Sequence, residues 1–308
     1  MSISLSILPS LSLHHHTHTH AHPPLTTRSM SLLRTLTHAH PLRHHQNRRR
    51  FFSLITASAV QQDTTLFTPT PISLIEPAAE SLFHVSIDVS DAPDIASSYT
   101  RPGQYLQLKV PQSPKPSFLA IASPPFVSTN KNRNSFELQF LVKTVPGSTA
   151  ELLCDLKKGD VVEITAAMGN GFDVHRISPP HIFSTVLIFA TGSGISPIRS
   201  LIESGFSADK RSDVRLYYGA RNLKRMAYQD RFEDWESSGV KIVPVLSQPD
   251  EGWTGETGFV QAAFCRSKNI LNPNATGVVL CGQKQMTEEI TSILSEDGVS
   301  TDKILKNF

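Results

Sequence analysis

Two patterns of hydrophobic positions divide this chain. Between residues 66 and 177, short segments of alternating or β-branched apolar residues are separated by clusters of Pro, Gly and Asn. Five of these segments are expected strands, at residues 81–90, 104–110, 118–123, 135–145 and 160–168. A single helix is expected among them, at residues 147–156, followed by a turn. Five or six such strands predict a small antiparallel β-barrel over residues 63–178.

The period changes after a proline-rich segment at residues 177–183, which has the composition of a hinge between domains. Apolar strands now alternate with helical stretches. The expected strands are residues 185–191, 213–220, 241–247 and 277–282, and the expected helices begin near 197, 228, 261 and 284. This order predicts a five-stranded parallel α/β domain over residues 182–308, with helices on both faces and ligands at the carboxyl ends of the strands.

The turn after the first of these strands, Thr191-Gly192-Ser193-Gly194, has the composition of a ligand loop. Its glycines allow close approach to a backbone, and the free N–H groups of the next helix suit an anion. Pro197 fits the first position of that helix. The Rossmann fingerprint is absent, because Pro197 stands where its third glycine belongs and Arg221, not an acid, follows the next strand. By itself the turn fits a tight βα connection without a ligand equally well.

The first 62 residues differ from the rest in composition. They contain six of the 29 basic residues, ten of the 13 histidines and none of the 27 acidic residues, and they are rich in Ser and Thr. This profile predicts an organelle transit peptide over residues 1–58. The Ser/Thr content favours a chloroplast, and Arg50-Phe51-Phe52-Ser53 leaves a mitochondrion as the alternative. Without the leader the net charge falls from +2 to about −4, which argues against a nucleic-acid partner.

No apolar run has the length of a membrane span. The three cysteines, Cys154, Cys265 and Cys281, are far apart and form no CxxC pair. They fit reduced thiols and do not supply the ligands of an iron–sulfur cluster, and we expect no metal site.

Seven short motifs occur in a characteristic order: PGQYLQL, GST, MGNGF, TGSGISP, YYGAR, WTGETGFV and LCGQKQM. With the two-domain pattern, they make the chain resemble the ferredoxin–NADP reductase superfamily, and most of all its plant organellar members, including a fruit-associated group. The resemblance implies that the first domain binds FAD and the second NADH or NADPH. Hydride would pass from nicotinamide to flavin, and electrons would go to an acceptor that the sequence does not identify.

On the nicotinamide side, the resemblance puts Thr191, Gly192, Ser193 and Gly194 beside the ribose and pyrophosphate. It puts Cys281 and Gly282 beside the nicotinamide ring, although a small residue buried in a strand is the alternative for Cys281. The terminal Phe308 resembles aromatic residues that stack over the flavin in relatives, and a frayed end is the alternative.

On the flavin side, Ile121, Ala122 and Ser123 match the superfamily. The preceding Arg-x-Tyr-Ser/Thr sequence is replaced by Ser117, Leu119 and Ala120. The missing arginine removes a charge-assisted contact of about 1.5–3 kcal/mol, equivalent to roughly one to two orders of magnitude in affinity. Backbone groups of this strand remain available to hold the flavin.

Three further features of the flavin side follow from the resemblance. Gly147, Ser148 and Thr149 would meet the flavin diphosphate at the start of a helix, or Ser148 and Thr149 simply cap that helix together with Glu151. Gly169 fits the glycine-rich close of the domain. Tyr105 either contacts the flavin or belongs to an ordinary Pro-Gly turn.

The electron donor is open from the sequence. Members specific for NADP usually have an arginine after the serine that ends the third strand, but here Ser247 is followed by Gln248. The segment WTGETGFV resembles members that use NADH, which favours NADH. Arg221 is an alternative phosphate partner, or a solvated charge at a strand end.

We therefore expect an organellar flavin-dependent oxidoreductase. The substitutions at residues 117–120 keep two alternatives open. One is a non-catalytic nucleotide-binding or interaction protein with a degenerate flavin site. The other is a reductase that uses free flavin as a substrate.

Overall fold

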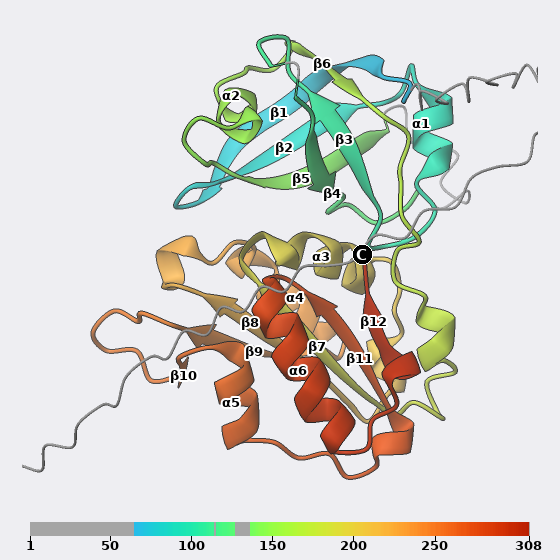
Figure 1. Cartoon of the computed structure of the whole chain (residues 1–308), viewed down its shortest axis with the longest axis vertical. Helices are drawn as coiled ribbons and strands as arrows, with labels where there is room; N and C mark the ends of the chain where they lie inside the picture. Colours follow the sequence, from blue (N-terminus) through green and yellow to red (C-terminus); the bar gives the residue numbers. More distant parts are fainter. Residues whose placement is uncertain (1–64, 114, 127–135, 308) are drawn as a thin grey trace, which may run out of the picture. The chain divides into compact units, whose positions relative to one another are not determined.

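The computed structural model describes residues 65–113, 115–126 and 136–307. The chain from Gln61 to Phe308 forms one compact unit. The expected transit peptide, residues 1–58, and Phe308 lie outside the described residues. Two sheets form this unit (Figure 1), and the expected boundary between them near Ile177 stays a prediction.

The first sheet is antiparallel and contains six strands in the order β4-β3-β6-β1-β2-β5. Their bounds are β1 Thr68–Ala79, β2 Leu82–Asp88, β3 Tyr105–Lys109, β4 Ser117–Ala120, β5 Glu137–Lys143 and β6 Val161–Ile164. An isolated bridge joins Ile121, the residue after β4, to Phe140 of β5 at the other end of this order. Such a link is what the predicted barrel requires, since a barrel has no free edge.

Strand β1 is absent from the five strands expected in this half of the chain. It holds three prolines, Pro69, Pro71 and Pro77, which argued against a central strand. The structure removes the conflict because β1 changes partner near Ile72. Residues 68–71 pair with β6 and residues 72–79 pair with β2. Each proline therefore lies where β1 has a ladder on one side, and its missing N–H costs no bond on the other.

The expectation of a single helix in this half is wrong. Helix α2, Thr149–Cys154, lies where it was expected, but a second short helix, α1, spans Pro93–Ser98. Its proline occupies the first turn, where the missing N–H is not needed. One side chain of α1, Ile95, is buried, which is too weak a periodic signal to identify a helix from the sequence.

The second sheet is parallel and has the order β10-β9-β8-β7-β11-β12. Its strands are β7 Thr185–Thr191, β8 Asp213–Ala220, β9 Lys241–Leu246, β10 Glu256–Thr257, β11 Thr276–Cys281 and β12 Ile304–Lys306. The sheet thus has six strands where the sequence predicted five. Both outermost strands are too short for an apolar pattern to reveal: β10 has two residues and β12 has three.

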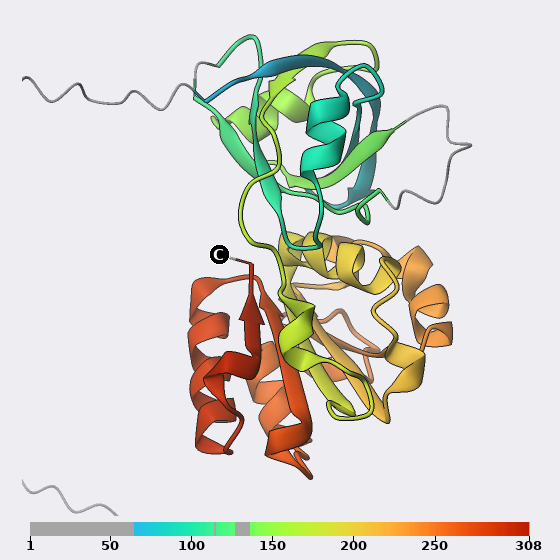
Figure 2. The same cartoon turned by 90° about the vertical axis from the view of Figure 1, so that its right-hand side faces the viewer.

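Helices cover both faces of the parallel sheet, as expected, and Figure 2 shows them on either side of its strands. Helices α3, Ile195–Glu203, and α4, Phe232–Ser237, share a core with Ile188 and Leu216. Helices α5, Val260–Arg266, and α6, Lys284–Glu296, share another with Phe189 and Tyr217, the next residues along the same strands. Alternate side chains of one strand point to opposite faces, so each strand contributes to both cores.

Among the helices of the described ranges, none combines the length and hydropathy needed to cross a membrane.

Candidate functional site: a cavity lined by both sheets

A cavity of about 700 Å³ is lined by residues of both sheets. From the antiparallel sheet it receives Tyr105, residues 117–120 and residues 141–143, and from α2 it receives Ala150. From the strand ends of the parallel sheet and the segments that follow them it receives residues 191–194, Ser196, Pro197, residues 281–283 and Asn307. These segments lie far apart in the sequence. The volume of the cavity and its mixed apolar and polar lining are those of a small-molecule site.

The structure brings together the predicted nicotinamide-side residues. Thr191, Gly192, Ser193 and Gly194 line the cavity with Cys281 and Gly282, because β7 and β11 are parallel neighbours and their carboxyl ends meet. Of the predicted flavin-side residues, Tyr105 lines the same cavity. Residues 121–123, residues 147–149 and Gly169 do not.

Close packing of two chain turns explains two of the glycines. A Cβ on Gly194 would lie 2.5 Å from the carbonyl oxygen of Cys281, and one on Gly282 would lie 2.1 Å from Thr191 Oγ1. The Gln283 N–H donates to that Thr191 hydroxyl at 3.0 Å. The turns after β7 and β11 are therefore held against each other at the floor of the cavity.

Gly192 differs, because it has a φ of +54° and nothing within 4 Å of the position of a Cβ. It needs glycine for its backbone conformation, and the space beside it is open. Helix α3 begins at Ile195, two residues before the expected start, so Pro197 is its third residue. Proline is still tolerated there because the first turn has no carbonyl partners for its N–H groups.

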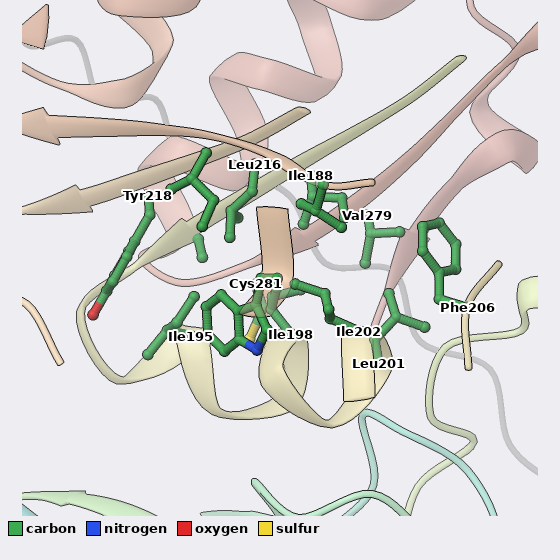
Figure 3. Packing of buried hydrophobic residues seen from close by; sticks show 14 of the residues in the cluster. Ile188, Ile195, Ile198, Leu201, Ile202, Phe206, Leu216, Tyr218, Val279 and Cys281 are labelled. Carbon is green, nitrogen blue, oxygen red and sulfur yellow. The ribbon is translucent and has the colours of Figure 1, made fainter. Parts of the chain in front are cut away.

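Cys281 contributes a neutral thiol to the cavity. It ends β11 at 5% exposure, and Figure 3 shows it among Ile195, Ile198 and Val279. Burial raises the pKa of this thiol to about 12, since the apolar surroundings disfavour the thiolate. The side chain thus fits the predicted small residue beside a ring, and a thiolate nucleophile is not formed at neutral pH.

After Ala120, the predicted flavin strand makes its hydrogen bonds to other parts of the protein. Ile121 and Ala122 are fully buried, and their N–H groups donate to Gln104 and Gln139 carbonyl oxygens at 3.1 and 2.7 Å. Ser123 Oγ accepts from the Gln139 N–H at 3.2 Å. Ala122 and Ser123 attach the strand to β5, and Ile121 attaches it to Gln104 beside β3. All three residues lie outside the cavity lining, so a direct flavin contact by them stays a prediction.

Residues 117–120 face the cavity instead. They form β4, which ends the strand order and has β3 as its ladder partner. A strand with one ladder leaves a second row of backbone groups for a ligand. The aromatic ring of Tyr105 lies 5.9 Å from that of Phe118 in an edge arrangement. Gly169, at φ +80°, supports Tyr105, because a Cβ there would lie 2.7 Å from the ring.

The start of α2 is capped by its own side chains. Ser148 Oγ accepts from the Glu151 N–H at 3.4 Å, and the Glu151 carboxylate accepts from the Gly147 N–H at 2.6 Å. Thr149 donates to the Lys115 carbonyl at 2.9 Å. This is the capping alternative of the sequence analysis. None of the three predicted diphosphate residues lines the cavity, and their role toward flavin stays a prediction.

Comparisons with known proteins identify the family. Residues 188–292 match the oxidoreductase NAD-binding domain family. The fruit protein pKIWI502 of Actinidia deliciosa is 46% identical over 298 residues, which cover 90% of this chain and 93% of that protein. The chain belongs to the ferredoxin–NADP reductase-like superfamily.

Two further comparisons extend this assignment. An anthranilate 1,2-dioxygenase electron transfer component of Acinetobacter baylyi is 24% identical over 77% of this chain and 65% of its own length. The structure of a ferredoxin NADP+ reductase from Neisseria gonorrhoeae with bound FAD and NADP aligns with a TM-score of 0.61 at 17% identity, covering 79% of this chain and 99% of that one. The predicted superfamily, the predicted two-domain fold and the prediction of an oxidoreductase with a nicotinamide-nucleotide partner are confirmed.

The residues expected to set donor choice in this superfamily lie at the carboxyl ends of β8 and β9. The Gln248 N–H donates to the Arg221 carbonyl at 2.7 Å, and the Ser247 N–H donates to the Ala220 carbonyl at 3.0 Å. Arg221 and Ser247 are therefore adjacent, although neither lines the cavity. Arg225, another basic residue nearby, pairs with Glu80 through Nε at 3.0 Å and a second short contact.

Sequence reasoning missed several residues of this reductase-like cavity. Leu141, Val142 and Lys143 line it at the end of β5, and Lys143 is the one charged side chain of the lining. Asn307 lines it just after β12. The motif order that identified the superfamily contains none of these positions, and only the pairing of strands brings them to the cavity. Ser196 had a signal, since it lies within the motif TGSGISP.

Proposed function

We propose that this protein is an organellar flavin oxidoreductase that takes electrons from a nicotinamide nucleotide, holds FAD and passes electrons to a separate acceptor. One observation carries the proposal: the single cavity is lined both by Tyr105 and β4 of the antiparallel sheet and by the two βα turns of the parallel sheet. Tyr105 of the expected flavin side thus shares one space with the residues expected on the nicotinamide side.

The residues of the cavity fit the two cofactors. Leu119, Leu141 and Val142 give it an apolar wall, and Tyr105 and Phe118 add aromatic rings suited to a planar ligand. Lys143 supplies a positive charge, and no carboxylate is among the lining residues. A lining with a positive charge and no acidic side chain suits anionic dinucleotides. Lys143 partly replaces the positive charge of the arginine that the superfamily has at the position of Ser117.

When bound, the nicotinamide supplies a hydride and the flavin accepts it and releases electrons to the next carrier. The protein's own contribution is alignment and the exclusion of water. The turns at residues 191–194 and 281–283 hold each other in place, so the floor of the cavity is pre-organised. Cys281 keeps its proton because burial raises its pKa to about 12, and it therefore adds no charge to that floor.

We further propose NADH as the preferred donor and the chloroplast stroma as the location, with the mitochondrion as the alternative. The donor proposal is supported by Gln248 after Ser247 and by the pairing of Arg225 with Glu80, which occupies one of the basic side chains that could otherwise meet a 2′-phosphate. The location is supported by the acid-free leader of residues 1–62.

The function is tested by the visible absorption spectrum of the purified protein in the presence of added FAD. After removal of free flavin, we expect bound flavin that bleaches on anaerobic addition of NADH and more slowly with an equal amount of NADPH. Protein that stays colourless after incubation with FAD contradicts a bound flavin. Turnover of free flavin then separates a reductase with flavin as substrate from a non-catalytic binder.

The location is tested separately by fusing residues 1–62 to a fluorescent protein in plant cells. We expect the signal to coincide with chlorophyll fluorescence. A signal confined to mitochondria selects the alternative, and a cytosolic signal contradicts the transit-peptide proposal.

A further inference from the structure

Two polar side chains of the cavity have a buried oxygen with no hydrogen-bond partner among the described residues. Asn307 is 7% exposed and Ser196 is 1% exposed. Asn307 Oδ1 and Ser196 Oγ are both buried, and neither has a partner among the described residues. Of the unpartnered buried side-chain atoms in the described ranges, these are the two whose residues line the cavity.

An unpaired buried oxygen is costly, since it loses its bonds to water and gains none in return, at about 1–3 kcal/mol. Two such atoms in one cavity indicate that a polar ligand completes their bonding. The neighbouring Thr191 hydroxyl is different, because it already accepts from the Gln283 N–H at 3.0 Å. The buried oxygens that still need a hydrogen-bond partner are therefore those of Asn307 and Ser196.

The chemistry of these two oxygens selects the ligand group. An amide oxygen such as Asn307 Oδ1 accepts hydrogen bonds, whereas a serine hydroxyl both donates and accepts. A phosphate or carboxylate has no proton to offer the unpartnered Oδ1 of Asn307. A neutral amide has both an N–H donor and a carbonyl acceptor, and the neutral Cys281 thiol at the end of the adjacent strand adds no charge. The pair thus matches an amide better than an anion.

Position makes Asn307 the more informative of the two residues. It follows β12, which pairs with β11, so it lies at the same carboxyl edge as Cys281 and Gly282. It comes from the last residues of the chain and from no motif of the superfamily. Ser196 lies in the first turn of α3, the helix that follows β7.

We propose that Asn307 and Ser196 are positioning residues that bind amide groups of the redox cofactors. Asn307 Oδ1 accepts from an amide N–H, and Ser196 Oγ donates to an amide carbonyl. This inference rests on the proposed function, which supplies two sources of the amide: the carboxamide of nicotinamide and the imide edge of the flavin ring.

Equilibrium binding to the full chain distinguishes the two sources. NAD+ is compared by calorimetry with its 3-acetylpyridine analogue, in which a methyl group replaces the carboxamide NH2. FAD is compared with N3-methyl-FAD, which lacks the imide N–H, in binding to flavin-free protein. The wild-type protein is expected to prefer one parent cofactor over its analogue by about threefold to tenfold, the value of one hydrogen bond.

Asn307→Leu keeps the size of the side chain and removes its oxygen. We expect this variant to lose the preference, with the parent and the analogue binding equally. Lys306→Leu is the matched control, since it changes the exposed neighbouring residue outside the cavity and should keep the full preference. Ser196→Ala should weaken binding of the same parent cofactor by a few-fold.

Asn307→Asp keeps an acceptor oxygen and should retain the preference, which guards against a variant that fails to fold. If Asn307→Leu abolishes the preference for NAD+ over its analogue, the amide is that of nicotinamide. If it abolishes the preference for FAD over N3-methyl-FAD, the amide is that of the flavin. Equal preferences in the wild type, Asn307→Leu and Asn307→Asp proteins, with FAD and NAD+ still bound, overturn this inference and leave the proposed function intact. Wild-type protein that binds neither cofactor overturns the proposed function, and the inference with it.

Discussion

Gly192 and Gly194 stand two residues apart, yet different constraints select glycine at each position. Gly194 has ordinary helical backbone angles, with φ −62°, and its Cβ position overlaps backbone atoms of Cys281 and Gly282. Gly192 has open space and a left-handed φ of +54°. The sequence motif treats the two glycines alike, while their stability costs differ in origin.

Gly194→Ala should therefore destabilise the protein more than Gly192→Ala. An added methyl group at Gly194 must displace the turn after β11, at about 3 kcal/mol, whereas alanine in the left-handed region costs about 1 kcal/mol. Urea unfolding followed by tryptophan fluorescence measures both changes. Equal losses in the two variants would contradict the close packing of the two turns.

At the scale of single elements, β12 shows how a three-residue strand becomes part of the core. Ile304 and Leu305 are 5% and 2% exposed, and they belong to the cores on opposite faces of the parallel sheet. Their alternation follows from the two-residue period of a strand. The structure pairs residues 304–306 with β11, while the expected stacking or fraying of Phe308 lies outside the described residues and stays a prediction.

Leu305→Ala should lower the free energy of unfolding by about 2–5 kcal/mol, because it leaves a cavity in a packed core. The adjacent Lys306→Ala removes an exposed side chain and should change it by less than about 0.5 kcal/mol. Chemical denaturation of the two variants makes the comparison. Similar small effects would mean that β12 is not packed as described.

At the scale of the whole molecule, buried polar contacts join the elements of the two sheets. Arg199 of α3 is 6% exposed and donates to Glu203 at 3.1 Å and to Gln139 of β5 at 2.7 Å. The Tyr99 and Ser200 hydroxyls meet at 2.6 Å. Helix α3 thus begins at the cavity and is fixed near its middle to β5 and to Tyr99, which follows α1.

Replacing Arg199 with methionine should destabilise the protein by about 3 kcal/mol, since it leaves the partly buried Glu203 carboxylate with fewer partners. Arg225→Met breaks an exposed ion pair with Glu80 between the same two parts of the chain and should have a much smaller effect. Thermal unfolding of both variants at matched pH gives the ranking. A larger loss for Arg225→Met would place the stabilising contact at the surface.

The sequence by itself determined most of the longer elements and the superfamily. Buried strands such as Thr185–Thr191 and the amphipathic helix Lys284–Glu296 carry a local hydrophobic period, so they are readable without neighbours. The order of the motifs made the chain resemble the ferredoxin–NADP reductase superfamily, which the comparisons confirm. Strand β1 escaped this reasoning, since its prolines are harmless only after its change of partner is known.

Only the tertiary structure decided which residues share the cavity. Burial and hydrogen-bond partners depend on contacts between distant segments, and a motif does not encode them. Ser148 caps its own helix, and the N–H groups of Ile121 and Ala122 donate to backbone carbonyls within the first half of the chain. Asn307, which follows β12, lines the cavity with its Oδ1 unpartnered among the described residues. The physical reason is that a local sequence sets the conformation of a segment, whereas the packing of all segments sets which polar atoms remain free for a ligand.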